Sequence, residues 1–364
     1  MRWFRFVAVM LGLAGAALAT EVGLRIAGMG YGSSPMESDP YLHHVHPKNY
    51  RFVEHHPSGE LGGFEIEYNA EGRAFRGRGA TPVVPPGTTL PCRIALMGDS
   101  FTEAGQVPFE DSFAGLLESA ARDSCEVRNY GTRSYSPSIY LVQWTRDVQL
   151  WKPDAVFLLL FGNDVREDVT YLQNATRDER GFPTAVHGPG GGWLFAQLRK
   201  LYTARVARAM YMQAEWAWHH RGQKQWTVGG VVEENPDFTG ETPALVRELD
   251  RRVAAAGSRL VVMSVPSRYR LMGDGSIPVD HDFHQTVKEF TAAGGIAFLD
   301  LRVPFERAAR AGVPLFWQRD IHFNEAGNRV VAAAIARSYP PFFTKGAEID
   351  GPIVTAAFPA GSTP

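Results

Sequence analysis

The chain has 364 residues, of which 45% are hydrophobic and 21% are charged, and its formal net charge is −2. These values predict a globular protein built around one large domain, and they exclude the basic composition that is typical of nucleic-acid-binding proteins. Two cysteines exclude a disulfide-rich scaffold and any metal site made of several cysteines, although one disulfide remains open.

The amino terminus carries an export signal. Arg2 and Arg5 precede an apolar run that ends in the small-residue pattern Ala17-Leu18-Ala19. This order is typical of a cleavable signal peptide, while the partly apolar residues 21–26 also allow an uncleaved anchor. Because the arginines stay inside, both alternatives place the rest of the chain outside the cytoplasm. We expect an exported, periplasmic or extracytoplasmic protein in which residues 1–30 are a signal peptide or an inner-membrane anchor.

Residues 31–90 are rich in proline, glycine and histidine and are expected to form a small β-rich segment and a linker. The stretches Tyr50–Glu54 and Phe64–Tyr68 predict a hairpin, and the four prolines of residues 81–91 predict the linker. Five histidines occur in the segment: His43, His44, His46, His55 and His56. Carboxylates and cysteines do not repeat beside them at ligand spacing, so we expect no metal and no cofactor.

From residue 91 to about residue 345, strands alternate with helices. The predicted strands are Arg93–Met97, Glu126–Tyr130, Ala155–Phe161, Arg259–Val265 and Ile296–Leu299. The predicted helices are Phe109–Arg122, Pro137–Leu150, Thr242–Ala256, Asp282–Ala293, Pro304–Ala311 and Asn324–Ser338. Because wholly apolar strands belong in a sheet covered on both faces, the pattern predicts a three-layer α/β sandwich with a central, parallel, five-stranded sheet.

Two parts of the chain depart from this alternation. The interval of about residues 165–240 is too long for a connection, so it predicts a tryptophan-rich insertion between the third and fourth strands. Residues 346–364 are expected to form a flexible tail. 

The two cysteines stand at equivalent places in the predicted sheet. Cys92 immediately precedes the first strand, and Cys125 precedes the second. Neighbouring strands bring Cα atoms within about 5 Å, which is inside disulfide reach. We therefore expect a Cys92–Cys125 disulfide at the sheet edge opposite Ser100.

Polar residues suited to acyl transfer follow the strands. Ser100 ends the sequence Gly98-Asp99-Ser100 after the first strand, and Gly131 and Asn163 follow the second and third. Asp320 and His322 lie near the carboxyl terminus. Acyl transfer needs a nucleophile, a base, an acid that orients the base, and donors for the oxyanion. Because the carboxyl ends of parallel strands meet at one edge, these residues are expected to come together there.

These four segments resemble, in order, the blocks of the SGNH, or GDSL-type, hydrolase superfamily. The resemblance covers about residues 93–340 and implies a flavodoxin-like fold with Ser100 as the nucleophile. It also implies that His322 is the base and that Asp320 orients it. The oxyanion donors implied are the N–H groups of Ser100 and Gly131 and the amide of Asn163.

One departure from the family pattern concerns the last block. The aspartate stands two residues before His322 rather than three, and Phe323 takes the place of a frequent proline. Similar spacing occurs in exported members of the superfamily that act on bacterial polysaccharides, including alginate acetylation proteins. The triad assignment is therefore retained.

The resemblance and the export signal together imply an exported serine esterase or O-acyltransferase. The expected partner is a small acyl ester or an O-acylated, most simply O-acetylated, glycan, with membrane attachment through the amino terminus and without nucleic acid. One alternative is a lipase or thioesterase whose acyl-chain pocket is lined by the insertion. The other alternative is a carbohydrate-binding assembly protein that keeps the fold but catalyses no reaction.

Overall fold

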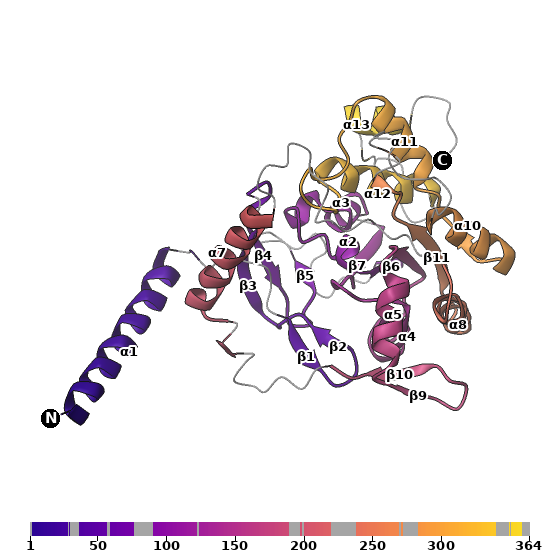
Figure 1. The fold of residues 1–364 in the computed structure, drawn as a ribbon. Helices are drawn as coiled ribbons and strands as arrows, with labels where there is room; N and C mark the ends of the chain where they lie inside the picture. The colour runs from indigo at the N-terminus through magenta and orange to yellow at the C-terminus, as the bar shows by residue number, and fades with distance from the viewer. Residues whose placement is uncertain are drawn as a thin grey trace.

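The computed structural model of the chain describes residues 2–27, 29, 36–56, 59–75, 90–121, 124–188, 197–198, 200–219, 238–268, 271, 283–339, 349 and 351–358. Its centre is a parallel sheet of five strands, which confirms the predicted fold class (Figure 1). The strands are β6 (Cys92–Gly98), β7 (Cys125–Asn129), β8 (Ala155–Leu160), β11 (Arg259–Ser264) and β12 (Ala297–Phe298). Their spatial order is β7-β6-β8-β11-β12, so the first strand lies between the second and the third, as in a flavodoxin-like sheet.

Helices cover both faces of the sheet. One face carries α3 (Phe113–Ala120), α11 (Arg302–Arg310) and α12 (Glu325–Ser338), and the other carries α4 (Pro137–Arg146), α5 (Asp164–Leu172), α8 (Thr242–Ala255) and α10 (Phe283–Gly294). The six residues of β8 are all buried, and they alternate between the two cores. This alternation explains why β8 is apolar throughout, since a strand that is covered on both faces has no side exposed to water.

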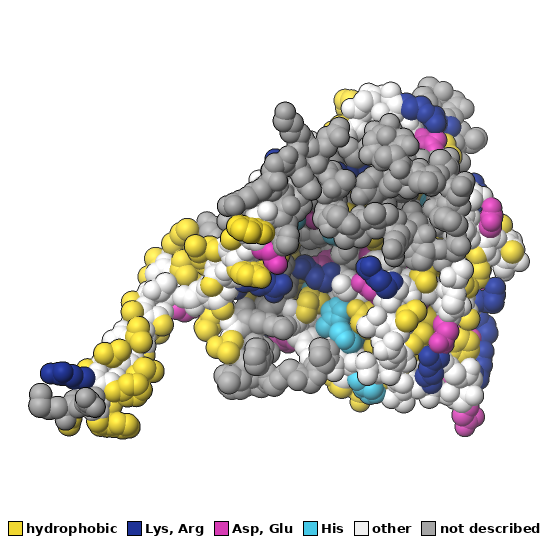
Figure 2. Space-filling model, in the orientation of Figure 1, with side chains coloured by type: hydrophobic (Ala, Val, Ile, Leu, Met, Phe, Trp, Pro, Cys, Tyr) yellow, Lys and Arg dark blue, Asp and Glu magenta, His cyan; other side chains and the backbone are white. Residues whose placement is uncertain are grey.

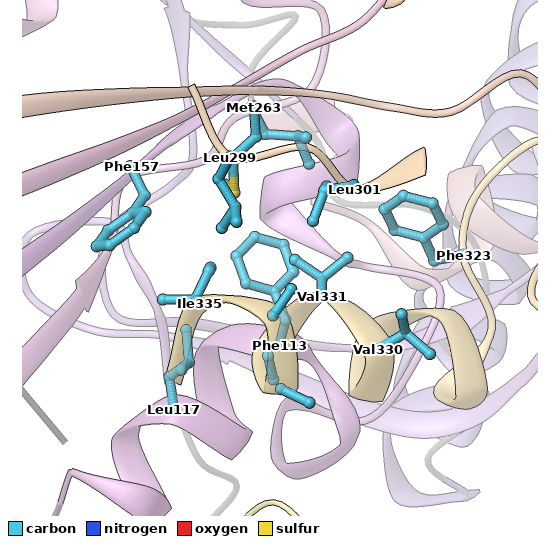
Figure 3. Close-up of a cluster of buried hydrophobic side chains, with 14 of the residues drawn as sticks. Phe113, Leu117, Phe157, Met263, Leu299, Leu301, Phe323, Val330, Val331 and Ile335 are labelled. Atoms are coloured by element: carbon cyan, nitrogen blue, oxygen red, sulfur yellow. The ribbon is translucent and has the colours of Figure 1, made fainter. Parts of the chain in front are cut away.

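The first core joins segments that are far apart in the sequence. Figure 3 shows Phe113 and Leu117 of α3 meeting Val331 and Ile335 of α12 beneath Phe157 of β8. The loop before α12 belongs to the same core through Phe323, which is 2% exposed. Packing of this core therefore fixes the position of the residues that immediately precede Phe323.

The expectation of a flexible tail over residues 346–364 is wrong for the part that the structure describes. A short helix, α13 (Pro352–Ala357), packs against α11 and α12. Ile349, Val354 and Phe358 are buried in the first core. A helix this short has little stability of its own, so its sequence carries a weak signal and tertiary packing holds it in place.

A small β-rich region precedes the main sheet. Strands β3 (Tyr50–His55) and β4 (Gly62–Tyr68) pair antiparallel as predicted, and β5 (Ala74–Phe75) extends them to three strands. Phe52, Ile66 and Tyr68 form the core of this sheet. A separate pair, β1 (Glu37–Asp39) and β2 (His43–Val45), lies upstream, and much of the predicted linker falls outside the described residues.

The interval between β8 and β11 contains more than connecting chain. Beyond α5 and before α8, it holds the hairpin β9 (Ala175–Arg177)–β10 (Pro183–Val186) and the helix α7 (Tyr202–His219). The hairpin packs against α4, and Val186 enters the second core. Two of its tryptophans, Trp193 and Trp226, lie outside the described residues.

Helix α1 (Arg2–Ala27) projects away from the rest of the molecule (Figures 1 and 2). Its segment Trp3–Ala27 is long and apolar enough to cross a membrane and is not buried against protein. Figure 2 shows hydrophobic side chains along this helix and a basic side chain near its amino-terminal end. Near the other end, the carboxylate of Glu21 accepts hydrogen bonds from the backbone N–H groups of Tyr202 (3.0 Å) and Thr203 (2.9 Å), at the start of α7. Such a helix is typical of both a signal sequence and a membrane anchor.

Cys92 and Cys125 are paired across β6 and β7. They are partners in the strand register, their Cα atoms are 4.5 Å apart, and a disulfide joins their sulfur atoms. Each cysteine begins its strand, so the bridge lies at the amino ends of the strands, away from the edge where Ser100 emerges.

Replacing both cysteines with serine is expected to lower the free energy of unfolding of the full chain by roughly 3 to 4 kcal/mol. The reason is that the bridge closes a loop between positions 33 residues apart. Denaturant titration of the oxidised parent and of the double variant measures the difference, and reduction of the parent is the control. Two free thiols in the denatured, unreduced parent would contradict the disulfide.

Candidate active site

Ser100 lies at the carboxyl end of β6 and begins the short helix α2 (Ser100–Glu103). The turn between them needs glycine at position 98, because a Cβ there would lie 2.8 Å from the carbonyl oxygen of Leu159. Asp99 is fully buried, and its carboxylate accepts the N–H of Phe101 at 2.9 Å. Asp99 therefore caps α2, and burial raises its pKa to about 6. The result is a serine hydroxyl presented at a helix amino terminus.

His322 and Asp320 meet Ser100 at this edge, although 222 residues separate the serine from the histidine. His322 Nε2 lies 2.7 Å from Ser100 Oγ. On the other side of the ring, His322 Nδ1 lies 2.6 Å from Asp320 Oδ1. The structure thus brings together the three residues predicted as catalytic, in the order serine, histidine and aspartate.

The two-residue spacing of Asp320 and His322 has a local explanation. Asp320 Oδ1 also accepts the backbone N–H of His322 at 2.8 Å, so the carboxylate folds back over its own turn. The same oxygen therefore holds both the backbone and the ring of the histidine. Phe323, which replaces the frequent proline, packs edge-on against Phe101 with ring centroids 4.9 Å apart. The side chain after the histidine thereby fixes the turn by hydrophobic packing.

Asp320 and His322 each stabilise the charged form of the other. Burial favours the neutral imidazole, but the negative charge and the hydrogen bond of Asp320, together with Asp99, raise the pKa of His322 above its usual value. Burial likewise opposes ionisation of Asp320, yet the charge and hydrogen bonds of His322 lower the pKa of this carboxyl to about 2. Asp320 is therefore an anion at neutral pH, as the orienting member of a triad must be.

Gly131 makes contacts that differ from the expected ones. A Cβ at this position would lie 2.3 Å from the backbone nitrogen of Glu103, so only glycine lets the loop after β7 pack onto α2. The N–H of Gly131 donates to Asn129 Oδ1 at 2.8 Å, and Asn129 Nδ2 donates to the carbonyl of Thr102. The N–H that the resemblance assigns to the oxyanion hole is therefore hydrogen-bonded to Asn129 in this structure, and the lack of a side chain at Gly131 permits the close packing.

Asn163 precedes α5 at the end of β8. Its Oδ1 atom is buried and has no hydrogen-bond partner among the described residues. Its amide contacts Glu167, whose pKa rises to about 8, mainly through burial and the nearby charge of Asp99. Asp164, by contrast, has a turn-holding role, since its carboxylate accepts the N–H of Phe161 at 3.0 Å.

An ion pair between the buried Glu103 and the partly exposed Arg133, which the sequence did not reveal, ties the nucleophile helix to the loop after β7. The carboxylate of Glu103 accepts the backbone N–H of Arg133 at 2.6 Å and its Nε at 3.1 Å. His46 Nε2 lies 3.2 Å from the same carboxylate. Burial alone would raise the pKa of Glu103, but Arg133 and His46 hold it well below its usual range. Glu103 stands one helical turn after Ser100, and that spacing is the signal that would have pointed to it.

Three of the amino-terminal histidines, His44, His46 and His56, contact residues around the site. His44 Nε2 lies 2.7 Å from the carbonyl oxygen of Arg133, and the ring of His46 stacks on Tyr68. His56 Nε2 lies 3.4 Å from Asp320 Oδ2. Within the described residues, no group of three or more histidines, cysteines or carboxylates is placed to hold a metal.

A second serine, histidine and aspartate series lies elsewhere in the sheet. Ser264 Oγ is 2.7 Å from His284 Nδ1, and His284 Nε2 is 2.9 Å from Asp300 Oδ1. Ser264 is fully buried and His284 is 1% exposed. A substrate cannot reach Ser264 in this conformation, so the series serves to satisfy buried polar groups.

The family comparison identifies part of the chain. Residues 226–350 match the family described as "SGNH hydrolase-like domain, acetyltransferase AlgX". This segment is about a third of the chain and contains Asp320 and His322. No curated protein sequence matches the chain.

Several solved structures are similar to the chain at low identity. LAE5, an alpha/beta hydrolase from the metagenome of Lake Arreo in Spain, is 16% identical, with 71% of this chain and 99% of that chain covered and a TM-score of 0.43. AlAXEase, an acetyl xylan esterase, is 16% identical, with 68% and 98% covered and a TM-score of 0.42. Axe2, an acetylxylan esterase from Geobacillus stearothermophilus, is 16% identical, with 70% and 98% covered and a TM-score of 0.40. Similarities at this level carry no argument about substrate or mechanism.

The family match and the fold agree with the ordered sequence blocks. The match includes the last block, and the sheet has the flavodoxin-like strand order that the resemblance implies. Residues 226–350 therefore match an SGNH hydrolase-like domain, and the fold class and the ordered sequence blocks are consistent with an SGNH-type hydrolase or acyltransferase.

Proposed function

We propose that the chain is an exported serine esterase or O-acyltransferase that forms an acyl-enzyme on Ser100. The observation that carries the proposal is the continuous contact from Ser100 Oγ through the ring of His322 to Asp320, with distances of 2.7 and 2.6 Å. A nucleophile, a base and an orienting anion in this order are the parts that acyl transfer requires.

In the first half-reaction, Ser100 Oγ attacks the carbonyl carbon of the ester while His322 Nε2 takes the hydroxyl proton. The imidazolium is stabilised by Asp320 and returns the proton to the leaving oxygen when the carbon–oxygen bond of the ester breaks. In the second half-reaction, water or a sugar hydroxyl gives its proton to His322 and attacks the acyl carbon. The bond between that carbon and Ser100 Oγ then breaks, and His322 returns the proton to Ser100 Oγ. Water produces hydrolysis, whereas a sugar hydroxyl produces transfer.

The developing oxyanion needs hydrogen-bond donors close to Ser100. The N–H of Ser100 is available because first-turn N–H groups have no acceptor within their own helix. The amide of Asn163, at the end of the adjacent strand β8, is the second proposed donor. Loss of one such donor typically lowers kcat by about 100-fold to 1,000-fold. The N–H of Gly131 is not included, since Asn129 accepts it.

The proposed substrate is a small O-acyl group, such as acetyl, on a carbohydrate outside the cytoplasm. The matching family is described as an acetyltransferase, which supports the acyl group. The apolar helix α1 and the disulfide Cys92–Cys125 support an exported protein, because disulfides persist in oxidising compartments. Attachment to the inner membrane through α1 is part of the same proposal.

Ser100→Ala is expected to lower turnover of p-nitrophenyl acetate by the full chain by about 1,000-fold or more, since the nucleophile is removed. It should also abolish labelling by a fluorophosphonate probe. Ser264→Ala is the matched control, because Ser264 also contacts a histidine but is buried. This variant should keep both activities, and circular dichroism checks that both variants fold. Equal turnover by Ser100→Ala and the parent would refute the proposed nucleophile.

The pH profile of kcat/KM is expected to have an acid limb centred above the ordinary histidine value of about 6.5. Only neutral His322 accepts the proton of Ser100, and Asp320 raises the pKa of His322, so activity falls as the pH drops through that raised value. Asp320→Asn removes the negative charge and should move the midpoint to lower pH while also reducing the rate. A midpoint that stays in place or rises in Asp320→Asn would contradict this assignment.

The size of the acyl group can be measured with a series of p-nitrophenyl esters. A site for small acyl groups should give a higher kcat/KM for acetyl than for octanoyl esters, because a long chain needs an apolar pocket. Mass spectrometry of the full chain after exposure to each ester reports the acyl group on Ser100. A preference for octanoyl would instead favour a lipase or thioesterase.

A further inference from the structure

The tip of the β3–β4 hairpin lies against the loop that carries Asp320. The tip is closed by backbone hydrogen bonds from His56 N to Leu61 O (3.3 Å) and from Gly59 N to His56 O (2.9 Å). The carboxylate of Glu60 accepts the backbone N–H groups of Gln318 and Arg319. The hairpin therefore satisfies two backbone donors immediately before Asp320.

The loop is held from its other side by an arginine. Arg268, which is 6% exposed, donates to the carbonyl oxygens of Gln318 (2.7 Å) and Asp320 (3.1 Å). An anion on the hairpin and a cation after β11 thus bind the donors and acceptors of the same short loop. The backbone that presents the Asp320 carboxylate is therefore held independently of the contacts that the Asp320 side chain itself makes.

The two oxygens of Asp320 have different surroundings. Oδ1 accepts both the backbone N–H and the ring Nδ1–H of His322. Oδ2 faces His56 Nε2 at 3.4 Å, and the two side chains are 24% (His56) and 13% (Asp320) exposed. Removing a carboxylate from water costs free energy unless polar or charged groups compensate, and His56 is placed to compensate Oδ2.

We propose that His56 is a positioning residue that holds the Asp320 carboxylate in the rotamer that orients His322. The inference rests on the proposed catalytic roles of Asp320 and His322 and adds a member from the amino-terminal region to them. With Oδ2 held by His56, the carboxylate cannot turn to offer Oδ2 to the ring. Without that contact, a rotated carboxylate would release the His322 ring from the line to Ser100.

The test compares His56→Ala, His56→Gln and Arg51→Ala in the full chain with p-nitrophenyl acetate. His56→Ala removes the contact with Asp320 Oδ2 and should lower kcat by about 10-fold with little change in KM, since the carboxylate loses its partner on that side. His56→Gln keeps an amide N–H near the position of Nε2 and should recover kcat to within about 3-fold of the parent. Arg51→Ala is the matched control, because Arg51 pairs with Glu65 on the exposed side of the same hairpin and should leave kcat unchanged.

A second measurement does not depend on turnover. The low-field proton resonance of His322 Nδ1–H should shift or broaden in His56→Ala and return in His56→Gln. Parent kcat and an unchanged resonance in His56→Ala would overturn the proposal. Equal losses in His56→Ala and His56→Gln would also overturn it, because they would assign His56 to docking of the hairpin. If the parent itself lacks turnover that depends on Ser100, the proposed function fails, and the resonance alone decides the role of His56.

Discussion

The candidate site depends on one carboxylate that stays charged inside the protein. Ionised Asp320 would be costly in that position without donors, because burial takes water away from its oxygens. His322 supplies two N–H groups, one from its backbone and one from its ring, and Arg268 binds the backbone carbonyl of Asp320. The Asp320 anion in turn stabilises protonated His322. The same contacts therefore keep the buried carboxylate charged and make His322 a better base.

The nucleophile side of the site is organised by a second buried charge. Glu103 joins α2 to the loop after β7 through Arg133, and the close packing of Gly131 brings the two backbones together. Removing Arg133 would leave the buried Glu103 carboxylate without this countercharge, which destabilises the folded state. The amino-terminal region takes part on both sides, through His46 at Glu103 and through Glu60 at the loop before Asp320. The amino-terminal β-rich region therefore helps to hold the residues of the candidate site in place.

The sequence was informative where a short pattern decides the structure. Ala155–Leu160 is apolar at every position and could only be a strand covered on both faces, and its predicted end differs by one residue from the observed one. Ser100 and His322 were accessible to prediction because each stands in a short block at a strand end or helix start. The parallel sheet predicted that the blocks at the strand ends converge, and the resemblance implied that the block with Asp320 and His322 joins them.

The remaining features depend on contacts between distant segments, which local patterns do not encode. The Gly131 N–H donates to the side chain of Asn129, whose orientation the sequence does not specify. The role of Arg133 can be recognised only once the fold places it beside Glu103. The helix α13 is too short to give a periodic signal, and burial of Val354 and Phe358 stabilises it. His56 belongs to a histidine group that a sequence pattern cannot separate from solvated loop residues.

The contact between Glu21 and the start of α7 bears on where the enzyme can work. A catalytic body on a flexible linker samples a volume that grows with the length of the linker. Here a carboxylate of α1 binds two amides of α7, and Arg205 of α7 donates to the hydroxyl of Tyr50 in β3 at 2.9 Å. With α1 in a bilayer, this series of contacts would replace a long tether with a short joint. The joint would then keep the main sheet and its site close to the membrane surface.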